Sequence, residues 1–150
     1  MDLIAAAENL AGALHAGKVD KAGEPYIVHL RRVAANLLRR WPDAAPAEVA
    51  AAWLHDALED TAATPESLRA AGMPEETVAI VRAVTRPAGV PYLAWIADLA
   101  ATGPRGALRV KVADNEDNRD PVRVARLPGA ARMVATRYEP ARRVLETALS

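Results

Sequence analysis

The densest group of chemically competent side chains lies in the stretch HDALED at residues 55–60, directly after an apolar run. His55 and Asp56 are adjacent, and neighbouring helical side chains diverge by about 100°, so one cation can bind between them. Glu59 and Asp60 follow one helical turn later. A solvated acidic helix end would explain these last two alone, although acidic residues there oppose the helix dipole. The stretch therefore predicts a metal-ligand pair beside two further carboxylates.

A second histidine, His29, lies among the apolar residues Ile27, Leu30 and Val33, which have helical spacing. Taken alone, a histidine on such a face is more often a structural residue than a metal ligand. Its interest comes from the other segments, because an imidazole is a good ligand for a divalent ion that already has carboxylate ligands.

A third segment places Lys111, Asp114 and Asn118 on one helical face, at positions i, i+3 and i+7. A cation, a carboxylate and an amide together suit a site where a metal meets a phosphate, although a solvated charged face is equally consistent. Two imidazoles and two carboxylates suit Mn²⁺, Fe²⁺ or Zn²⁺ and leave coordination positions open. The predicted metal ligands are His29, His55, Asp56 and Asp114.

A glycine-punctuated basic loop, residues 17–23, supplies Lys18 and Lys21. Such loops are common, but these lysines and Lys111 are candidates to meet the charge that develops on a phosphate. A carboxylate near the metal, Glu59 or Asp60, is the candidate group for accepting or returning a proton.

Proline divides the chain into helical stretches, because a residue without an N–H suits the first position of a helix. Thr64 before Pro65 and Asp120 before Pro121 are predicted caps. We predict an all-α fold in a single domain over residues 1–150, with a kink or break at Pro140. The predicted helices span about residues 2–16, 25–40, 46–59, 65–71, 74–85, 91–101, 104–118, 121–127 and 130–149.

Composition excludes several classes of site. The chain has no Cys, which rules out disulfides and thiolate zinc sites. A formal net charge of +0 argues against a main role in gripping nucleic acid. No apolar run approaches the ~20 residues of a membrane span, and the N-terminus lacks the basic region of a signal peptide. We therefore expect a cytoplasmic protein, and these properties leave room for a local basic pocket that binds a small phosphorylated ligand.

The order of the four predicted ligands resembles that of the HD superfamily of metal-dependent phosphohydrolases. The surrounding residues are similar to the alarmone (ppGpp) hydrolase domains within that superfamily. The similarity covers roughly residues 8–118 and fades over residues 119–150. The matching segments are HAG at 15–17, GEPYIVH at 23–29, LHDALEDT at 54–61, AVT at 83–85 and KVAD at 111–114, with Asn118 beyond them.

The resemblance implies a compact HD-domain helical bundle that removes the 3′-diphosphate of an alarmone nucleotide as pyrophosphate. It implies Mn²⁺ as the usual ion on the four predicted ligands, with Fe²⁺ or Zn²⁺ as alternatives. The hydrolytic step falls to the residues matching Glu59 and Asp60. Residues near the nucleotide match Lys21, Tyr26 and Asn118. Because the chain has no room for a synthetase domain, it resembles the stand-alone small hydrolases.

Three positions depart from the pattern of the alarmone hydrolases. Asp20 stands where they typically carry an arginine that stacks on guanine, Leu30 replaces a proline, and Asn115 replaces an arginine. A carboxylate cannot stack as a guanidinium plane does, so a guanine or adenine alarmone or another phosphorylated nucleotide stays open as substrate. The alternatives are an HD enzyme acting on other nucleotides and a non-catalytic HD module that senses a nucleotide or binds a partner.

Overall fold

A computed structural model of the protein describes residues 2–150 as a series of short helices with no strand among them, which confirms the all-α prediction. Within this range Val19 and Pro25 form an isolated antiparallel bridge. No helix in the described range is long and apolar enough to cross a membrane. The elements are α1 (Leu3–Leu14), α2 (Tyr26–Arg40), α3 (Pro46–Leu54), α4 (Ala57–Asp60), α5 (Pro65–Ala70), α6 (Glu75–Ala83), α7 (Tyr92–Thr102), α8 (Arg105–Asn118), α9 (Pro121–Arg126), α10 (Ala130–Met133), the π-helix η1 (Val134–Tyr138) and α11 (Glu139–Leu149).

The helices begin where the prolines and caps predict. The Thr64 hydroxyl accepts a hydrogen bond from the Ser67 N–H at 3.0 Å, and the Asp120 carboxylate accepts one from the Val122 N–H at 2.9 Å. Each proline predicted to precede a helix is the first helical residue or the cap before it. These prolines are Pro25, Pro46, Pro65, Pro74, Pro91, Pro104 and Pro121.

Helix α3 is the central element, and its residues from Ala47 to Leu54, except Glu48, are buried. It packs against α1, α2, α6 and α8. Its alanines allow these neighbours to approach closely, and the buried residues of α1 are likewise alanines, Ala7 and Ala11. A helix buried on nearly all sides is a rigid support for the residues at its C-terminal end.

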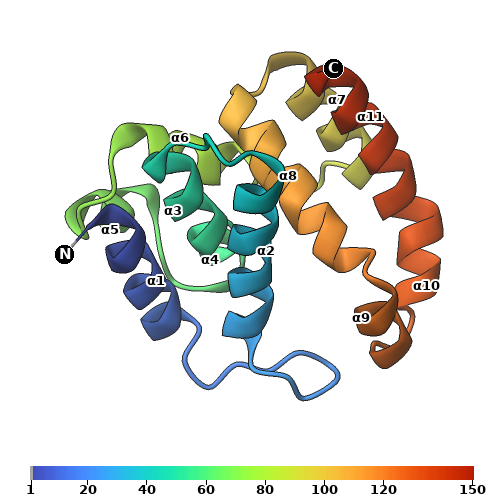
Figure 1. The fold of residues 1–150 in the computed structure, drawn as a ribbon, viewed down its shortest axis with the longest axis horizontal. Coiled ribbons are helices and arrows are strands. Elements are labelled where there is room, and N and C mark those ends of the chain that lie inside the picture. Colours follow the sequence, from blue (N-terminus) through green and yellow to red (C-terminus); the bar gives the residue numbers. More distant parts are fainter. Residues whose placement is uncertain (1) are drawn as a thin grey trace.

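Helix α8 joins the two halves of the molecule. In Figure 1 it lies between α2 on one side and α11 on the other, and α7 packs against both α8 and α11. The Asn36 side-chain amide of α2 donates to the Ala113 carbonyl of α8 at 3.2 Å. This bond fixes the two helices next to each other close to Asp114.

The helix predicted over residues 46–59 is interrupted, since α3 ends at Leu54 and α4 begins at Ala57. His55 Nδ1 donates to the Ala52 carbonyl at 2.7 Å, an acceptor that a continuous helix gives to the N–H of residue 56. The helical period is therefore lost at His55 and Asp56, two of the four residues predicted to bind metal.

The helix predicted over residues 130–149 is divided near Pro140, as expected, but the chain stays helical throughout. The π-helix η1 lies between α10 and α11, immediately before Pro140. Proline has no N–H to bond the carbonyl four residues earlier, and a wider π-turn accommodates that loss while the chain stays helical.

Candidate metal centre

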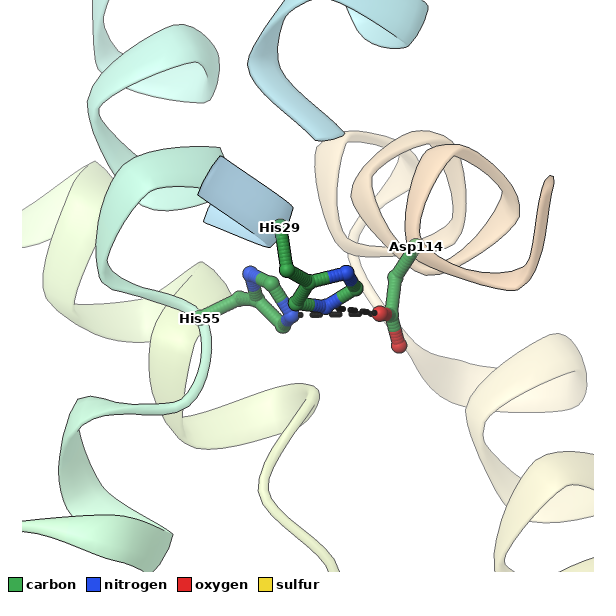
Figure 2. Close-up of side chains that lie close together, drawn as sticks. All are labelled: His29, His55 and Asp114. Atoms are coloured by element: carbon green, nitrogen blue, oxygen red, sulfur yellow. Dashed lines mark ion pairs between the residues drawn. The ribbon is translucent and has the colours of Figure 1, made fainter. Parts of the chain in front are cut away.

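Three separate elements bring one buried cluster together: α2 contributes His29, the turn after α3 contributes His55, and α8 contributes Asp114. Figure 2 shows both imidazoles directed at the same carboxylate. Asp114 Oδ1 lies 3.1 Å from His29 Nε2 and 3.2 Å from His55 Nε2. One ligand atom from each residue lies within 4.8 Å of the other two, so all three can contact a single ion.

Asp56, the fourth predicted ligand, lies at the edge of this cluster. Its Oδ2 is 3.2 Å from His55 Nε2 and 3.9 Å from His29 Nε2. The Tyr26 hydroxyl donates a hydrogen bond to the same oxygen. Asp56 is thus next to the three-residue cluster without being a member of it, and its carboxylate is more exposed than that of Asp114.

Each imidazole is oriented through its other nitrogen. His55 Nδ1 bonds the Ala52 carbonyl, and His29 Nδ1 lies 2.6 Å from Asp117 Oδ2. Both acceptors require a proton on Nδ1, so in its neutral form each imidazole presents the Nε2 lone pair to the cluster. His55 Nε2 is buried and has no hydrogen-bond partner within the described range. A buried, unpartnered nitrogen facing a carboxylate is the arrangement expected of a metal ligand.

The charges in the cluster favour a cation. Burial opposes ionisation, but Lys111 and His55 hold the pKa of Asp114 well below its usual range. Likewise, the pKa of Asp56 is lowered against burial, chiefly by His55. Despite the desolvation of both rings, Asp114 and Asp117 raise the pKa of His29, and Asp56 and Asp114 raise that of His55. Two ionised carboxylates facing two imidazoles are a donor set that fits a divalent ion.

Comparison with known proteins places this geometry in a family. The family model described as HD domain matches residues 7–143. The chain belongs to the HD-domain family. This match extends past residue 118, so the HD domain includes most of residues 119–150, the segment over which the resemblance to the alarmone hydrolases is expected to fade. The helices α9 to α11 are part of the HD domain, because α11 packs against α7 and α8.

Two similar proteins are informative. A GTP pyrophosphokinase of Myxococcus xanthus is 40% identical over 68 residues, which are 45% of this chain and 9% of that much longer protein. The solved structure of a metazoan ortholog of SpoT, described as hydrolysing ppGpp, matches with a TM-score of 0.70 and 20% identity. That match covers 99% of this chain and 94% of the other, and at this identity it establishes the fold.

In this HD domain Lys111 contacts the cluster through Asp114. Its ammonium donates to Asp114 Oδ2 at 2.8 Å and lies over the rings of Trp95 and Tyr92, 5.1 and 5.6 Å from their centroids. Its side chain is buried, and Asp114 and Tyr92 raise its pKa although burial alone would lower it. Asn118 donates to Asp114 Oδ1 at 3.3 Å. The shared face predicted for these residues is confirmed, and both are hydrogen-bonded to Asp114.

Glu59 and Asp60 are exposed at the edge of the site and face different recesses. Glu59 lines one with Arg86 and the loop that follows α6, whereas Asp60 lines another with Lys18 and Tyr26. Partial burial, followed by the charge of the nearby Asp56, raises the pKa of both carboxyl groups. Both are therefore close enough to the cluster to sense its charge.

The loop before α2 is ordered by Asp20. Its Oδ1 accepts from the N–H groups of Ala22 and Glu24 at 2.8 and 3.0 Å, and its Oδ2 lies 3.5 Å from Arg123 Nη1. Asp20 thus organises the loop and links it to α9. Lys18 donates to the backbone carbonyl of Asp60. Lys21 is exposed, and the structure does not bring it to the cluster.

Sequence reasoning missed two sets of residues around the site. Asp117 bonds His29, and its signal was available, since it follows Asp114 by three residues on the same helix. Arg86 and Arg137 lie over the Tyr92 ring, with guanidinium carbons 5.9 and 5.3 Å from its centroid. Arg86 directly follows the AVT segment in sequence, whereas Arg137 is distant from every motif, and only the fold brings both to the ring that Lys111 also contacts.

Proposed function

We propose that this protein is a metal-dependent phosphohydrolase in which His29, His55, Asp56 and Asp114 hold Mn²⁺, with Fe²⁺ or Zn²⁺ as alternatives. The observation that carries the proposal is the convergence of both Nε2 atoms on Asp114 Oδ1 within 3.2 Å. A helical bundle without a ligand would have no reason to bury two imidazoles and a carboxylate in this way, because desolvating them is costly.

The chain's own residues fit hydrolysis of a phosphate ester. A divalent cation here supplies Lewis-acid polarisation of a phosphoryl oxygen and makes hydroxide available near neutral pH. Glu59 or Asp60 accepts and returns the proton, and a raised pKa suits either to that task. Tyr26 holds Asp56 in place through its hydrogen bond. Lys18, Lys21 and Arg86 would stabilise the negative charge of the phosphate from the edge of the site. Lys111 would contribute its positive charge from its position next to Asp114.

For the substrate, we propose a nucleotide with a 3′-diphosphate, of the guanine or adenine alarmone type, from which pyrophosphate is released. The motif segments around His29 and His55 support this choice, as does the similarity to a SpoT ortholog described as hydrolysing ppGpp. Lys21, Tyr26 and Asn118 are the proposed nucleotide contacts. Asp20 is already bonded to its own loop and lies near Arg123, so base recognition would differ from stacking on an arginine.

The decisive experiment is an assay of the purified, manganese-supplemented protein against guanine and adenine 3′-diphosphate nucleotides, with products resolved by chromatography. We expect pyrophosphate and a nucleotide with a free 3′-hydroxyl. His55→Ala should abolish both manganese binding and turnover, while circular dichroism shows an unchanged helical content.

Other outcomes separate the alternatives. Orthophosphate without pyrophosphate would contradict cleavage of a 3′-diphosphate and favour another nucleotide substrate. Nucleotide binding without turnover, in protein shown to contain the metal, would favour a non-catalytic HD module.

A further inference from the structure

Helix α8 carries a second carboxylate, Asp117, which contacts His29 on the side away from the other cluster residues. It is buried, with 3% of its surface exposed, and its Oδ2 is 2.6 Å from His29 Nδ1. A carboxylate only accepts, so the imidazole proton lies on Nδ1. In the neutral imidazole, Nε2 then carries the lone pair, and this atom faces Asp114.

Two arginines keep Asp117 in place and ionised. Arg32 of α2 donates from Nε to Asp117 Oδ1 at 2.7 Å, and Arg123 Nε of α9 lies 3.7 Å from Asp117 Oδ2. Arg32 in turn pairs with Glu24 at 2.9 Å.

The two imidazoles of the cluster are therefore held differently. His55 donates to a neutral backbone carbonyl, whereas His29 donates to an anion that α2 and α9 hold between them. An anionic acceptor orients an imidazole ligand and increases its basicity. The local geometry thus favours His29 over His55 as the stronger electron donor.

We propose that Asp117 is a positioning residue of the metal centre, which fixes the tautomer and orientation of His29 and increases its affinity for the ion. This inference rests on the proposed metal site. In the contacts described above, Asp117 bonds His29 but neither His55 nor Asp114. It therefore acts on the cluster through His29.

The test uses the metal-free full chain and measures binding directly. Asp117→Ala removes the acceptor, and we expect affinity for Mn²⁺ by calorimetry to fall about 10- to 100-fold. Asp117→Asn keeps an acceptor oxygen without the charge, and we expect a smaller loss, roughly 10-fold. Titration with Co²⁺ adds a spectroscopic readout, because a displaced His29 changes the visible absorption of the bound ion.

The matched control is Glu116→Gln, the same change one residue earlier on α8, where the carboxylate pairs with Arg39 away from the cluster. It should bind both ions as the wild type does. If Asp117→Ala fails to fold, Asp117→Asn and the partly exposed Arg32→Met carry the test, and both should bind the ions more weakly.

Affinities and Co²⁺ spectra equal to those of the wild type in the folded variants would overturn the role of Asp117, even if their stability falls. A wild-type protein that binds neither ion would overturn the metal centre and this inference together. A wild type that binds metal with Asp117-dependent affinity but hydrolyses no phosphorylated nucleotide would overturn only the proposed function.

Discussion

At the scale of single residues, each cluster side chain has one polar atom held by the protein and one directed inward. His55 uses Nδ1 for the Ala52 carbonyl, His29 uses Nδ1 for Asp117, and Asp114 uses Oδ2 for Lys111. The two Nε2 atoms face Asp114 Oδ1, which also accepts a bond from Asn118. This division of labour makes the site rigid without a ligand, since each rotamer is fixed from behind.

The carboxylates at the rim should separate metal binding from turnover. In Glu59→Gln we expect manganese affinity to be preserved and turnover to fall by about 10²–10⁴-fold, because the amide cannot transfer a proton. Asp60→Asn, measured in parallel, tests the carboxylate that lines the recess with Lys18 and Tyr26. Steady-state kinetics with metal titration would check this, and Glu66→Gln on exposed α5 serves as the control. Full activity of Glu59→Gln would assign the proton transfer elsewhere.

Lys111 should matter most for stability when no metal is bound. Lys111→Met leaves Asp114 buried without its ammonium partner, and losing one member of a buried pair costs about 3–5 kcal/mol of unfolding free energy. Manganese should restore part of that loss by supplying positive charge to Asp114. Urea unfolding with and without manganese measures both the loss of unfolding free energy and the part that the ion restores.

Arg105→Met, at the exposed start of the same helix, should change stability by no more than about 0.5 kcal/mol. A Lys111→Met protein as stable as the wild type in chelator would show that Asp114 does not need this partner.

At the scale of elements, ion pairs fasten the last helix to the rest of the bundle. Glu146 of α11 accepts from Arg40 at the end of α2, and its other oxygen accepts from Arg142 at 2.8 Å. Asn115 of α8 also donates to the Tyr138 carbonyl of the π-helix at 2.8 Å. The segment beyond residue 119 is thus held by polar bonds as well as by the buried Ala141 and Leu145.

Glu146 should give this attachment a pH dependence. Burial acts to raise its pKa, but the bonds from Arg40 and Arg142 lower it below the usual value of 4.5. A carboxylate whose folded-state pKa is depressed stabilises the fold above its unfolded pKa and loses that contribution as pH falls through the folded value. We expect Glu146→Gln to cost about 0.2–1 kcal/mol at pH 7, since the pair is partly exposed.

The difference between Glu146→Gln and the wild type should shrink as the pH falls below about 4.5, which denaturant unfolding across pH would reveal. Glu8→Gln on the exposed side of α1 is the control and should change the unfolding free energy at pH 7 by no more than about 0.5 kcal/mol. If the difference in unfolding free energy stays constant down to strongly acidic pH, the ionised carboxylate of Glu146 contributes nothing to stability.

At the scale of the whole molecule, α2, the turn after α3, and α8 meet at one point, so an ion bound there links elements distant in sequence. A ligand that binds the folded state alone stabilises it by RT ln(1 + [L]/Kd), about 2.7 kcal/mol at 100 times Kd. For a chain of this length, each kcal/mol of added stability raises the melting temperature by roughly 2–4 °C.

Manganese in such excess should therefore raise the melting temperature by several degrees relative to chelator-treated protein, as measured by scanning calorimetry. The increase should disappear in His55→Ala. An identical melting temperature with manganese and with chelator would argue against a metal site that joins these elements.

The sequence by itself determined where most helices begin and which residues are candidates for the site. Proline and cap positions located the helix starts, and the residue types and motif order singled out His29, His55, Asp56 and Asp114. These features are local, because capping and helical periodicity depend on neighbours within a turn or two. The prolines also indicated an interruption near Pro140, although not its π-helical form.

The tertiary structure decided the rest, because it depends on contacts between distant segments. The break at His55 follows from an imidazole that turns back onto Ala52, and the burial of Lys111 follows from the rings of α7 packed over it. The link from His29 to Asp117, separated by 88 residues, exists only once α2 lies along α8. Residue spacing within a helix predicts which side chains share a face, whereas only packing determines what that face meets.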